Sequence, residues 1–199
     1  MRGSVFRYPT APHARTETPP AYVDYTSFKP YLQREFRRKC VYCRRSDFFV
    51  GKEGFGVEHY RPKSLFPSHR CVYSNLFYAC NRCNTAKGDH WPTRQKAKEA
   101  FIPNPCDHAM AGHLRYAGAT VVAKSIPGAF ALDLLHLNDK DFETIRETTI
   151  EAASALLMKI DILRKKRDEI DTAKTAKVAE IDLRLSQSTQ TLTRLGWEA

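Results

Sequence analysis

The sequence has 199 residues, a length that fits one compact domain with an appendage or two small units. Hydrophobic residues make up 42% of it and charged residues 27%, as in an ordinary globular chain. No apolar run approaches the roughly 20 residues that span a bilayer, which excludes a membrane-spanning helix.

Positive charge is concentrated in one part of the chain. Residues 34–98 contain 15 Lys/Arg and 5 Asp/Glu, so this segment carries the whole formal net charge of +10. The charges of the remaining residues cancel. A polyanion held at this segment explains such a concentration, and nucleic acid is the expected polyanion.

Residues 1–24 are predicted to form an extended N-terminal arm that becomes ordered only against a partner. Four prolines lie among threonine, alanine and arginine in this stretch. No apolar stretch of a signal peptide is present, so we expect a cytoplasmic location. In that compartment the six cysteines are expected to be metal ligands or free thiols, not disulfides.

A helix is predicted to start near Thr26, with Pro30 tolerated in its first turn. Phe28, Leu32 and Phe36 recur on one face of this helix, and basic residues lie around the other. The basic face is either a solvated surface or, because it runs into the first cysteine pair, a contact for backbone phosphates.

Two Cys-x-x-Cys pairs follow, formed by Cys40 with Cys43 and by Cys80 with Cys83. Each pair has the spacing of a zinc knuckle, and two pairs complete one tetrahedral site of four sulfurs. A structural Zn²⁺ is therefore predicted; unrelated buried thiols are the alternative.

The interval between the cysteine pairs has room for a β-hairpin. Glycines precede Val57 and suggest turns before a short strand, while Pro62 and Pro67 prevent helix in the loop that follows. Residues 84–87 are expected to begin a helix that packs under the hairpin. The predicted order is therefore hairpin, loop and helix, within a core unit of residues 25–100.

The remaining chain divides into two parts. Residues 101–138 are predicted to be an irregular extension with a small hairpin near residues 115–122. Residues 139–195 lack Gly and Pro and repeat apolar residues three and four apart. This pattern predicts an antiparallel helical hairpin over 139–199, broken near residues 171–175. The hairpin is either buried on its own domain or a docking surface for a partner.

The motifs of the cysteine-rich segment, taken together, resemble the HNH endonuclease family, whose core is the ββα-metal (His-Me) finger. They are Cys40-x-x-Cys43, Val57-Glu58-His59-Tyr60, Asn75-Leu76 and Cys80-x-x-Cys83-Asn84-x-x-Lys87. Residues 101–106 and 132–138 are also similar to HNH proteins of bacterial anti-phage modules. These include the nuclease partner of Septu-type and retron-linked ATPases.

The resemblance implies a role for each site residue. His59 takes the proton from the attacking water, and Asn75 holds the loop that orients its imidazole. Glu58 and Asn84 bind a catalytic divalent ion, Mg²⁺ or another, which stabilises the scissile phosphate and the leaving oxygen. Many family members have Asp in place of Glu58 and His in place of Asn84; if Asn84 is not a ligand, Asp89 and His90 are the substitutes.

Four cations of the motif region are predicted to contact nucleic acid, namely Arg61, Lys63, Arg82 and Lys87. We expect double-stranded DNA as the substrate, and a regulatory protein partner such as an ATPase. A binding module without catalysis, in which His59 is structural, is one alternative, and an RNA-directed nuclease is another. The predicted fold class is α+β, mostly helical: a zinc-pinned ββα-metal finger followed by the helical hairpin.

Overall fold

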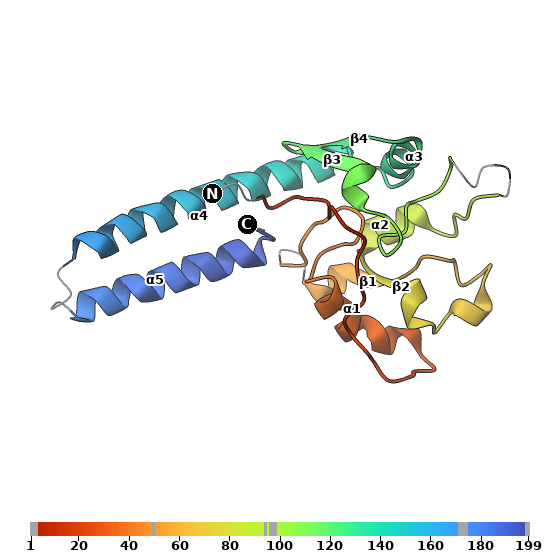
Figure 1. Cartoon of the computed structure of the whole chain (residues 1–199), viewed down its shortest axis with the longest axis horizontal. Coiled ribbons are helices and arrows are strands. Elements are labelled where there is room, and N and C mark those ends of the chain that lie inside the picture. The colour runs from red at the N-terminus through yellow and green to blue at the C-terminus, as the bar shows by residue number, and fades with distance from the viewer. Residues whose placement is uncertain (1–3, 49–50, 94, 96–98, 171–174, 198–199) are drawn as a thin grey trace.

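The computed structural model describes residues 4–48, 51–93, 95, 99–170 and 175–197. A globular part contains the short strands and helices, and a long pair of helices extends from it (Figure 1). In chain order, the helices and strands of the protein are α1 (Lys29–Glu35), β1 (Phe55–His59), β2 (Leu76–Cys80), α2 (Asn81–Lys87), β3 (Leu114–Ala117), β4 (Thr120–Ala123), α3 (Ile126–Leu134), α4 (Lys140–Glu169) and α5 (Thr175–Arg194). The mixed and mostly helical class predicted from the sequence is confirmed.

The finger consists of β1, β2 and α2. The two strands pair antiparallel, in a register that sets Phe55 opposite Cys80 and His59 opposite Leu76. All five residues of β2 are buried, whereas β1 is partly exposed at Gly56 and Val57. Helix α2 begins directly after β2, at Asn81 and not at the predicted residue 84, and it ends where Gly88 adopts a φ of 50°.

Helix α1 packs on this finger through the predicted apolar face. Phe28, Leu32 and Phe36 are all buried, and they belong to the same core as the four knuckle cysteines. A 3₁₀ turn, η1 (Tyr25–Phe28), precedes α1, and Pro30 lies in the first helical turn as expected. The turn brings Tyr25 next to the end of β1.

The N-terminal arm is extended, but it packs on the chain's own body. Val5, Phe6 and Tyr8 are at most 5% exposed, and the Tyr8 ring stacks on Tyr116 at 4.9 Å between centroids. Further along, the Arg15 guanidinium lies over the Phe77 ring at 4.8 Å and donates to the Leu76 carbonyl at 2.7 Å. The described part of the arm therefore packs within the chain, because its apolar and cationic side chains contact aromatic side chains of the core.

Helices α4 and α5 form the predicted hairpin. Ala153, Ile160 and Leu163 of α4 are buried, as are Ile181 and Leu192 of α5. The predicted break near residues 171–175 falls mostly on residues 171–174, which lie outside the described residues. None of the described helices has the combination of length and apolar character needed to cross a membrane.

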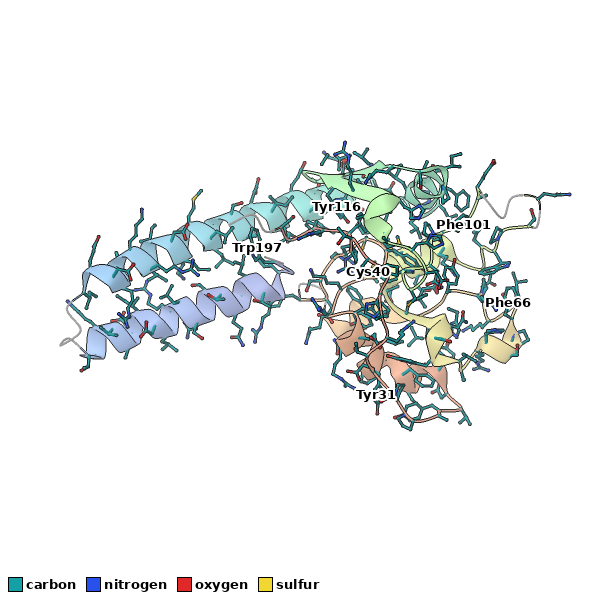
Figure 2. The ribbon with its side chains drawn as sticks, in the orientation of Figure 1. Tyr31, Cys40, Phe66, Phe101, Tyr116 and Trp197 are labelled. Carbon is teal, nitrogen blue, oxygen red and sulfur yellow. The ribbon has the colours of Figure 1, made fainter. Side chains whose placement is uncertain are left out.

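The base of this helical hairpin is fixed to the globular part. Buried Arg146 of α4 donates to the carbonyls of Ala119 and Leu137. At the other end, Lys39 donates to the Gly196 carbonyl at 2.7 Å, and Ser46 to the Arg194 carbonyl at 2.7 Å. Figure 2 labels Tyr116 and Trp197 at this junction and Cys40 within the globular part.

Candidate functional site

The four predicted zinc ligands converge in the structure. Cys40, Cys43, Cys80 and Cys83 are all buried, and their sulfur atoms lie within 4.8 Å of one another. The sulfurs of Cys43 and Cys80 are 3.7 Å apart. Four sulfurs about 2.3 Å from one Zn²⁺ in a tetrahedron are about 3.8 Å from each other, so the cluster has the size of a zinc site.

Strand β1 places Glu58 and His59 on its two opposite sides, because successive side chains alternate along a strand. Glu58 points to the side where Tyr42 and Lys87 contact it. His59 points to the side of Tyr25 and of the loop between β1 and β2. The two adjacent residues therefore lie in different surroundings.

The imidazole of His59 is held in one orientation. Its Nε2 lies 2.9 Å from the carbonyl oxygen of Arg70. Because a carbonyl only accepts, Nε2 carries the hydrogen and Nδ1 keeps a free lone pair. Burial lowers the pKa of His59, and the nearby Lys63, Lys87 and Arg70 charges lower it further. The ring is therefore a neutral proton acceptor at neutral pH.

Asn75 holds the loop that supplies this carbonyl. It lies in the 3₁₀ turn η4 (Tyr73–Asn75), and it is 6% exposed. Its Oδ1 accepts from the Arg61 amide at 2.8 Å, while its Nδ2 donates to the carbonyls of Arg61 and His69. The side chain thus fastens both ends of the segment from Arg61 to Arg70, which is consistent with a positioning role.

The carboxylate of Glu58 is buried in an ion pair. Only 2% of the residue is exposed, and Oε1 lies 2.7 Å from Lys87 Nζ. The Tyr42 hydroxyl donates to the same oxygen at 2.9 Å. Burial raises the pKa of Glu58, and the Lys87 ammonium opposes that rise. Lys87 also donates to the His59 carbonyl at 2.8 Å, so it joins α2 to the end of β1.

Asn84 lies on α2, one turn before Lys87. Its Nδ2 is 3.4 Å from the Val57 carbonyl. The same nitrogen is 3.4 Å from the position that a Cβ on Gly56 would take. Since Gly56 and Glu58 lie on one side of β1, Asn84 and Glu58 face the same side of the finger, and His59 leaves the strand on the other.

The oxygen donors of Glu58 and Asn84 match the preference of a hard divalent ion. The Lys87 ammonium, however, already neutralises the carboxylate at Oε1. An ion bound at that oxygen competes with Lys87, because two cations at one oxygen repel each other. The donor set therefore fits a divalent ion at Oε1 when the ion pair opens, whereas Oε2 is not part of that pair.

Two of the four cations predicted to contact nucleic acid are engaged elsewhere. Lys87 is 4% exposed and paired with Glu58. Arg82 pairs with Asp139 at 2.9 Å and Asp141 at 3.4 Å, around the start of α4. These two cations therefore meet carboxylates within the chain that the motif spacing did not reveal.

Arg61 and Lys63 are exposed beside the site. The Arg61 guanidinium lies over the rings of Phe66 and Trp91. Lys63 donates to the Tyr25 hydroxyl at 3.0 Å, and its ammonium lies 4.6 Å from the centre of that ring.

Sequence reasoning missed three residues around the site. Tyr25 sits edge-on to the His59 ring, with 4.7 Å between centroids. Arg70 orients His59 through its carbonyl and lies over the Tyr25 ring at 5.4 Å. Tyr42 donates to Glu58. No spacing in the chain pairs Tyr25 or Arg70 with His59, whereas the position of Tyr42 inside the first knuckle offered a signal.

Comparisons with known proteins agree with the motifs. A model of the HNH endonuclease family matches residues 40–90. The chain is 32% identical over 118 residues to the Septu protein PtuB of Bacillus thuringiensis. That match covers 57% of this chain and 43% of the relative, so the chain spans less than half of the relative's length.

No solved structure matches the chain significantly. The family match includes both cysteine pairs, the Glu58-His59 dipeptide and Asn84. The similarity to PtuB supports the Septu-type link that was expected from residues 101–106 and 132–138. Residues 40–90 of this protein therefore form a segment that matches the HNH endonuclease family model.

Proposed function

We propose that this protein is a metal-dependent endonuclease that hydrolyses DNA phosphodiester bonds, with His59 as the general base. The observation that carries the proposal is the hydrogen bond from Nε2 to the Arg70 carbonyl. It leaves the Nδ1 lone pair for a water molecule. The lowered pKa of His59 keeps the ring neutral and able to accept a proton near pH 7.

The reaction needs the water proton to move to Nδ1 while the water oxygen attacks phosphorus and the bond to the leaving oxygen breaks. A divalent ion held by Glu58 and Asn84 would supply charge stabilisation to the phosphate and the leaving oxygen. Because these two residues and His59 face opposite sides of β1, the scissile phosphate would have to reach both across the end of the strand. Asn75 and Arg70 hold the imidazole in position, so that no loop movement accompanies proton transfer. The expected products carry a 5′-phosphate and a 3′-hydroxyl.

Exposed cations beside His59 support a nucleic-acid substrate. Lys63 and Arg70 flank the Tyr25 ring, and Arg61 lies on the same loop. These groups can contact phosphates on either side of the scissile one without reading the bases. We therefore propose double-stranded DNA as the substrate, cleaved with little intrinsic sequence preference.

We further propose that the nuclease acts in the cytoplasm in anti-phage defence, under the control of a protein partner such as an ATPase. Similarity to a Septu protein supports this placement. The helical hairpin of residues 139–199 is the proposed docking element. It extends from the globular part (Figure 1) and exposes Met158, Ile162 and Leu183 by 55–68%. Arg82 connects the start of α4 to α2, which carries Asn84 and Lys87.

The test is an incubation of supercoiled DNA with the full chain, with and without Mg²⁺ or Mn²⁺, beside His59→Ala. Wild type is expected to nick or linearise the DNA only with the metal. His59→Ala is expected to lose about 10²–10⁴-fold of the rate and to keep DNA binding. If both proteins cleave equally, His59 is not the base.

The buried Glu58–Lys87 pair favours one second candidate, a binding module without catalysis, because a carboxylate already neutralised needs no metal. In that case wild type binds DNA and cleaves nothing under any metal. Matched DNA and RNA substrates in the same assay test the third possibility, an RNA-directed nuclease.

A further inference from the structure

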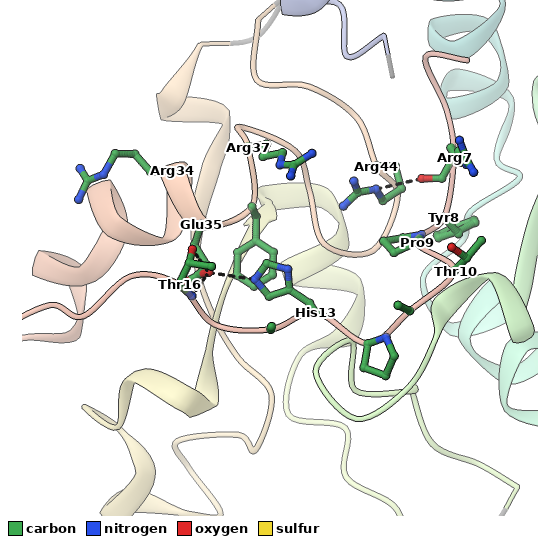
Figure 3. A pocket seen from close by; sticks show the side chains of 14 residues that line it. Arg7, Tyr8, Pro9, Thr10, His13, Thr16, Arg34, Glu35, Arg37 and Arg44 are labelled. Carbon is green, nitrogen blue, oxygen red and sulfur yellow. Dashed lines mark hydrogen bonds and ion pairs between the residues drawn. The ribbon is translucent and has the colours of Figure 1, made fainter. Parts of the chain in front are cut away.

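A cavity of about 520 Å³ lies between the N-terminal arm, the end of α1 and the first cysteine knuckle (Figure 3). Its wall includes the four arginines Arg7, Arg34, Arg37 and Arg44. The volume is in the range of pockets that hold small ligands. None of these arginines has a role in the nuclease site described above.

One acidic group lies in the wall, and its ionised carboxylate offsets one of the four positive charges. Glu35 is the carboxylate that lines the cavity, and its own side chain is fully engaged. Its Oε1 accepts from the Thr16 amide and hydroxyl and lies 3.0 Å from His13 Nε2. Its Oε2 accepts from the Glu17 amide and the Tyr73 hydroxyl. These donors fix the carboxylate against the arm and hold its pKa below the usual range in spite of its burial.

The four guanidinium groups differ in what they contact. Arg34 forms an ion pair with Glu17 at 2.7 Å and points away from the cavity centre in Figure 3. Arg44 is 8% exposed and its Nε donates to the Arg7 carbonyl, which fixes the arm to the knuckle. Arg37 and Arg7 are exposed, and their side chains have no hydrogen-bond or ion-pair partner within the described part of the chain.

The backbone at two of these arginines is unusual. Arg37 has a φ of 50° and Arg44 a φ of 54°, in the left-handed region that glycine adopts without strain. In Figure 3 their side chains point toward one another. Strained positions cluster at binding and active sites, but Arg38, outside the cavity wall, has a φ of 60°, so the cavity is marked by where the Arg37 and Arg44 side chains point and not by the strain.

We propose that this cavity binds phosphate groups, supplied either by a nucleic-acid strand or by a free nucleotide. Exposed Arg37 and Arg7 are the arginines that contact the phosphate, and buried Arg44 provides fixed positive charge beneath it. Guanidinium groups bind phosphate oxygens through two parallel hydrogen bonds, which gives the site its selectivity for phosphate. Binding here does not depend on cleavage at His59.

The experiment measures equilibrium binding to the full chain without added divalent metal, so that no DNA is cleaved. The probes are inorganic phosphate, ATP and a short DNA duplex, and the variant is Arg37→Gly. Because Arg37 is exposed and its φ suits glycine, the variant is expected to keep or raise its thermal midpoint. The matched control is Arg38→Gly, whose φ is 60° and whose side chain lies outside the cavity wall.

Arg37→Gly is expected to weaken ATP binding on the order of tenfold. For the duplex, it is expected to reduce the slope of log affinity against log salt by about one. Arg38→Gly removes the same charge and is expected to leave the ATP affinity and the salt slope for the duplex unchanged. Its thermal midpoint is expected to fall, because the variant loses the ion pair with Asp47. An effect on the duplex alone identifies a nucleic-acid strand as the source, and an effect on ATP alone identifies a nucleotide.

The proposal is overturned if neither ATP nor the duplex loses affinity in Arg37→Gly. It is also overturned if Arg38→Gly loses as much, since the binding then reflects net charge and not this cavity. A nuclease assay that shows no cleavage leaves these binding results unaffected, so the two proposals fail separately.

Discussion

Two sites share the β1–β2–α2 finger, and they differ in how complete they are. The four cysteines are buried with their sulfurs at the spacing of a tetrahedral zinc site. Glu58 of β1 and Asn84 of α2 face the same side of the finger, but the Lys87 ammonium lies 2.7 Å from the Glu58 carboxylate. The cysteine site is ready for its ion, whereas the oxygen site is held by an internal cation.

The comparison assigns different roles to the two proposed ions. An ion bound by four buried sulfurs contributes its binding free energy to folding. An ion that displaces Lys87 from Glu58 replaces one cation by another. Its contribution to the folding free energy is the difference between the two interactions, which is much smaller than that of a zinc ion. Four predictions test the cysteine site, the oxygen site and the histidine beside it.

The largest effect is expected from removing a zinc ligand. Cys80→Ser leaves three sulfurs in a core that includes Phe77 and Tyr78, and structural zinc contributes on the order of 10 kcal/mol to such small sites. We expect loss of the cooperative thermal transition and of bound zinc, measured by circular dichroism and elemental analysis. Cys71→Ser, outside the cluster, is the control and should keep both. Equal zinc content in the two variants would contradict the assignment.

Lys87→Met is expected to destabilise the fold by about 3–5 kcal/mol, because it leaves a buried carboxylate without its counter-charge. A divalent ion should then replace the ammonium, so Mg²⁺ or Mn²⁺ should raise the thermal midpoint of Lys87→Met more than that of wild type. The double variant Glu58→Gln/Lys87→Met removes both charges and is expected to lose this response to metal. A response equal to that of wild type would mean that the ion does not bind at Glu58.

Asn75→Ala tests whether the loop orients the base. It removes three hydrogen bonds to the backbone of Arg61 and His69, and we expect about 2–4 kcal/mol lower stability. Cleavage at saturating DNA should fall roughly 10–100-fold, since the Arg70 carbonyl loses its support. Asn75→Asp keeps the acceptor for the Arg61 amide, so its stability and its cleavage rate are expected to lie between those of wild type and Asn75→Ala. A stability loss with an unchanged rate would limit Asn75 to folding.

The smallest effect is a pH dependence set by His59. Burial and neighbouring cations lower the pKa of His59. The imidazole therefore stays neutral as the pH falls to about 6.5, the ordinary pKa of a histidine, and somewhat below it. Single-turnover cleavage should be level above that value and fall about tenfold per pH unit below the lowered pKa.

The same shift has a consequence for stability. The unfolded chain binds a proton at His59 at higher pH than the folded chain does, so this contribution to stability is present above about pH 6.5 and is lost as the pH falls toward the folded pKa. Urea titrations of wild type and His59→Ala at pH 5.5 and 7.5 measure it. A rate midpoint above pH 7 would contradict the proposed environment of the ring.

Local sequence patterns determined much of the fold. The spacing within Cys40–Cys43 and Cys80–Cys83 predicted a four-sulfur cluster because a knuckle imposes that spacing on its ligands. The apolar repeat without Gly or Pro predicted the helical hairpin, because such a pattern buries one face of each helix. The order of the HNH-like motifs along the chain predicted the ββα finger, since each motif has a fixed position on its strands or helix.

Only the tertiary structure decided the partners of the charged groups. Lys87 with Glu58, Arg82 with Asp139, and the Arg70 carbonyl with His59 join residues 29, 57 and 11 positions apart. The packing of the arm onto aromatic side chains of the core is equally non-local. Sequence periodicity reports which face of an element is buried, but which cation meets which carboxylate depends on how the elements dock, and no local pattern records that.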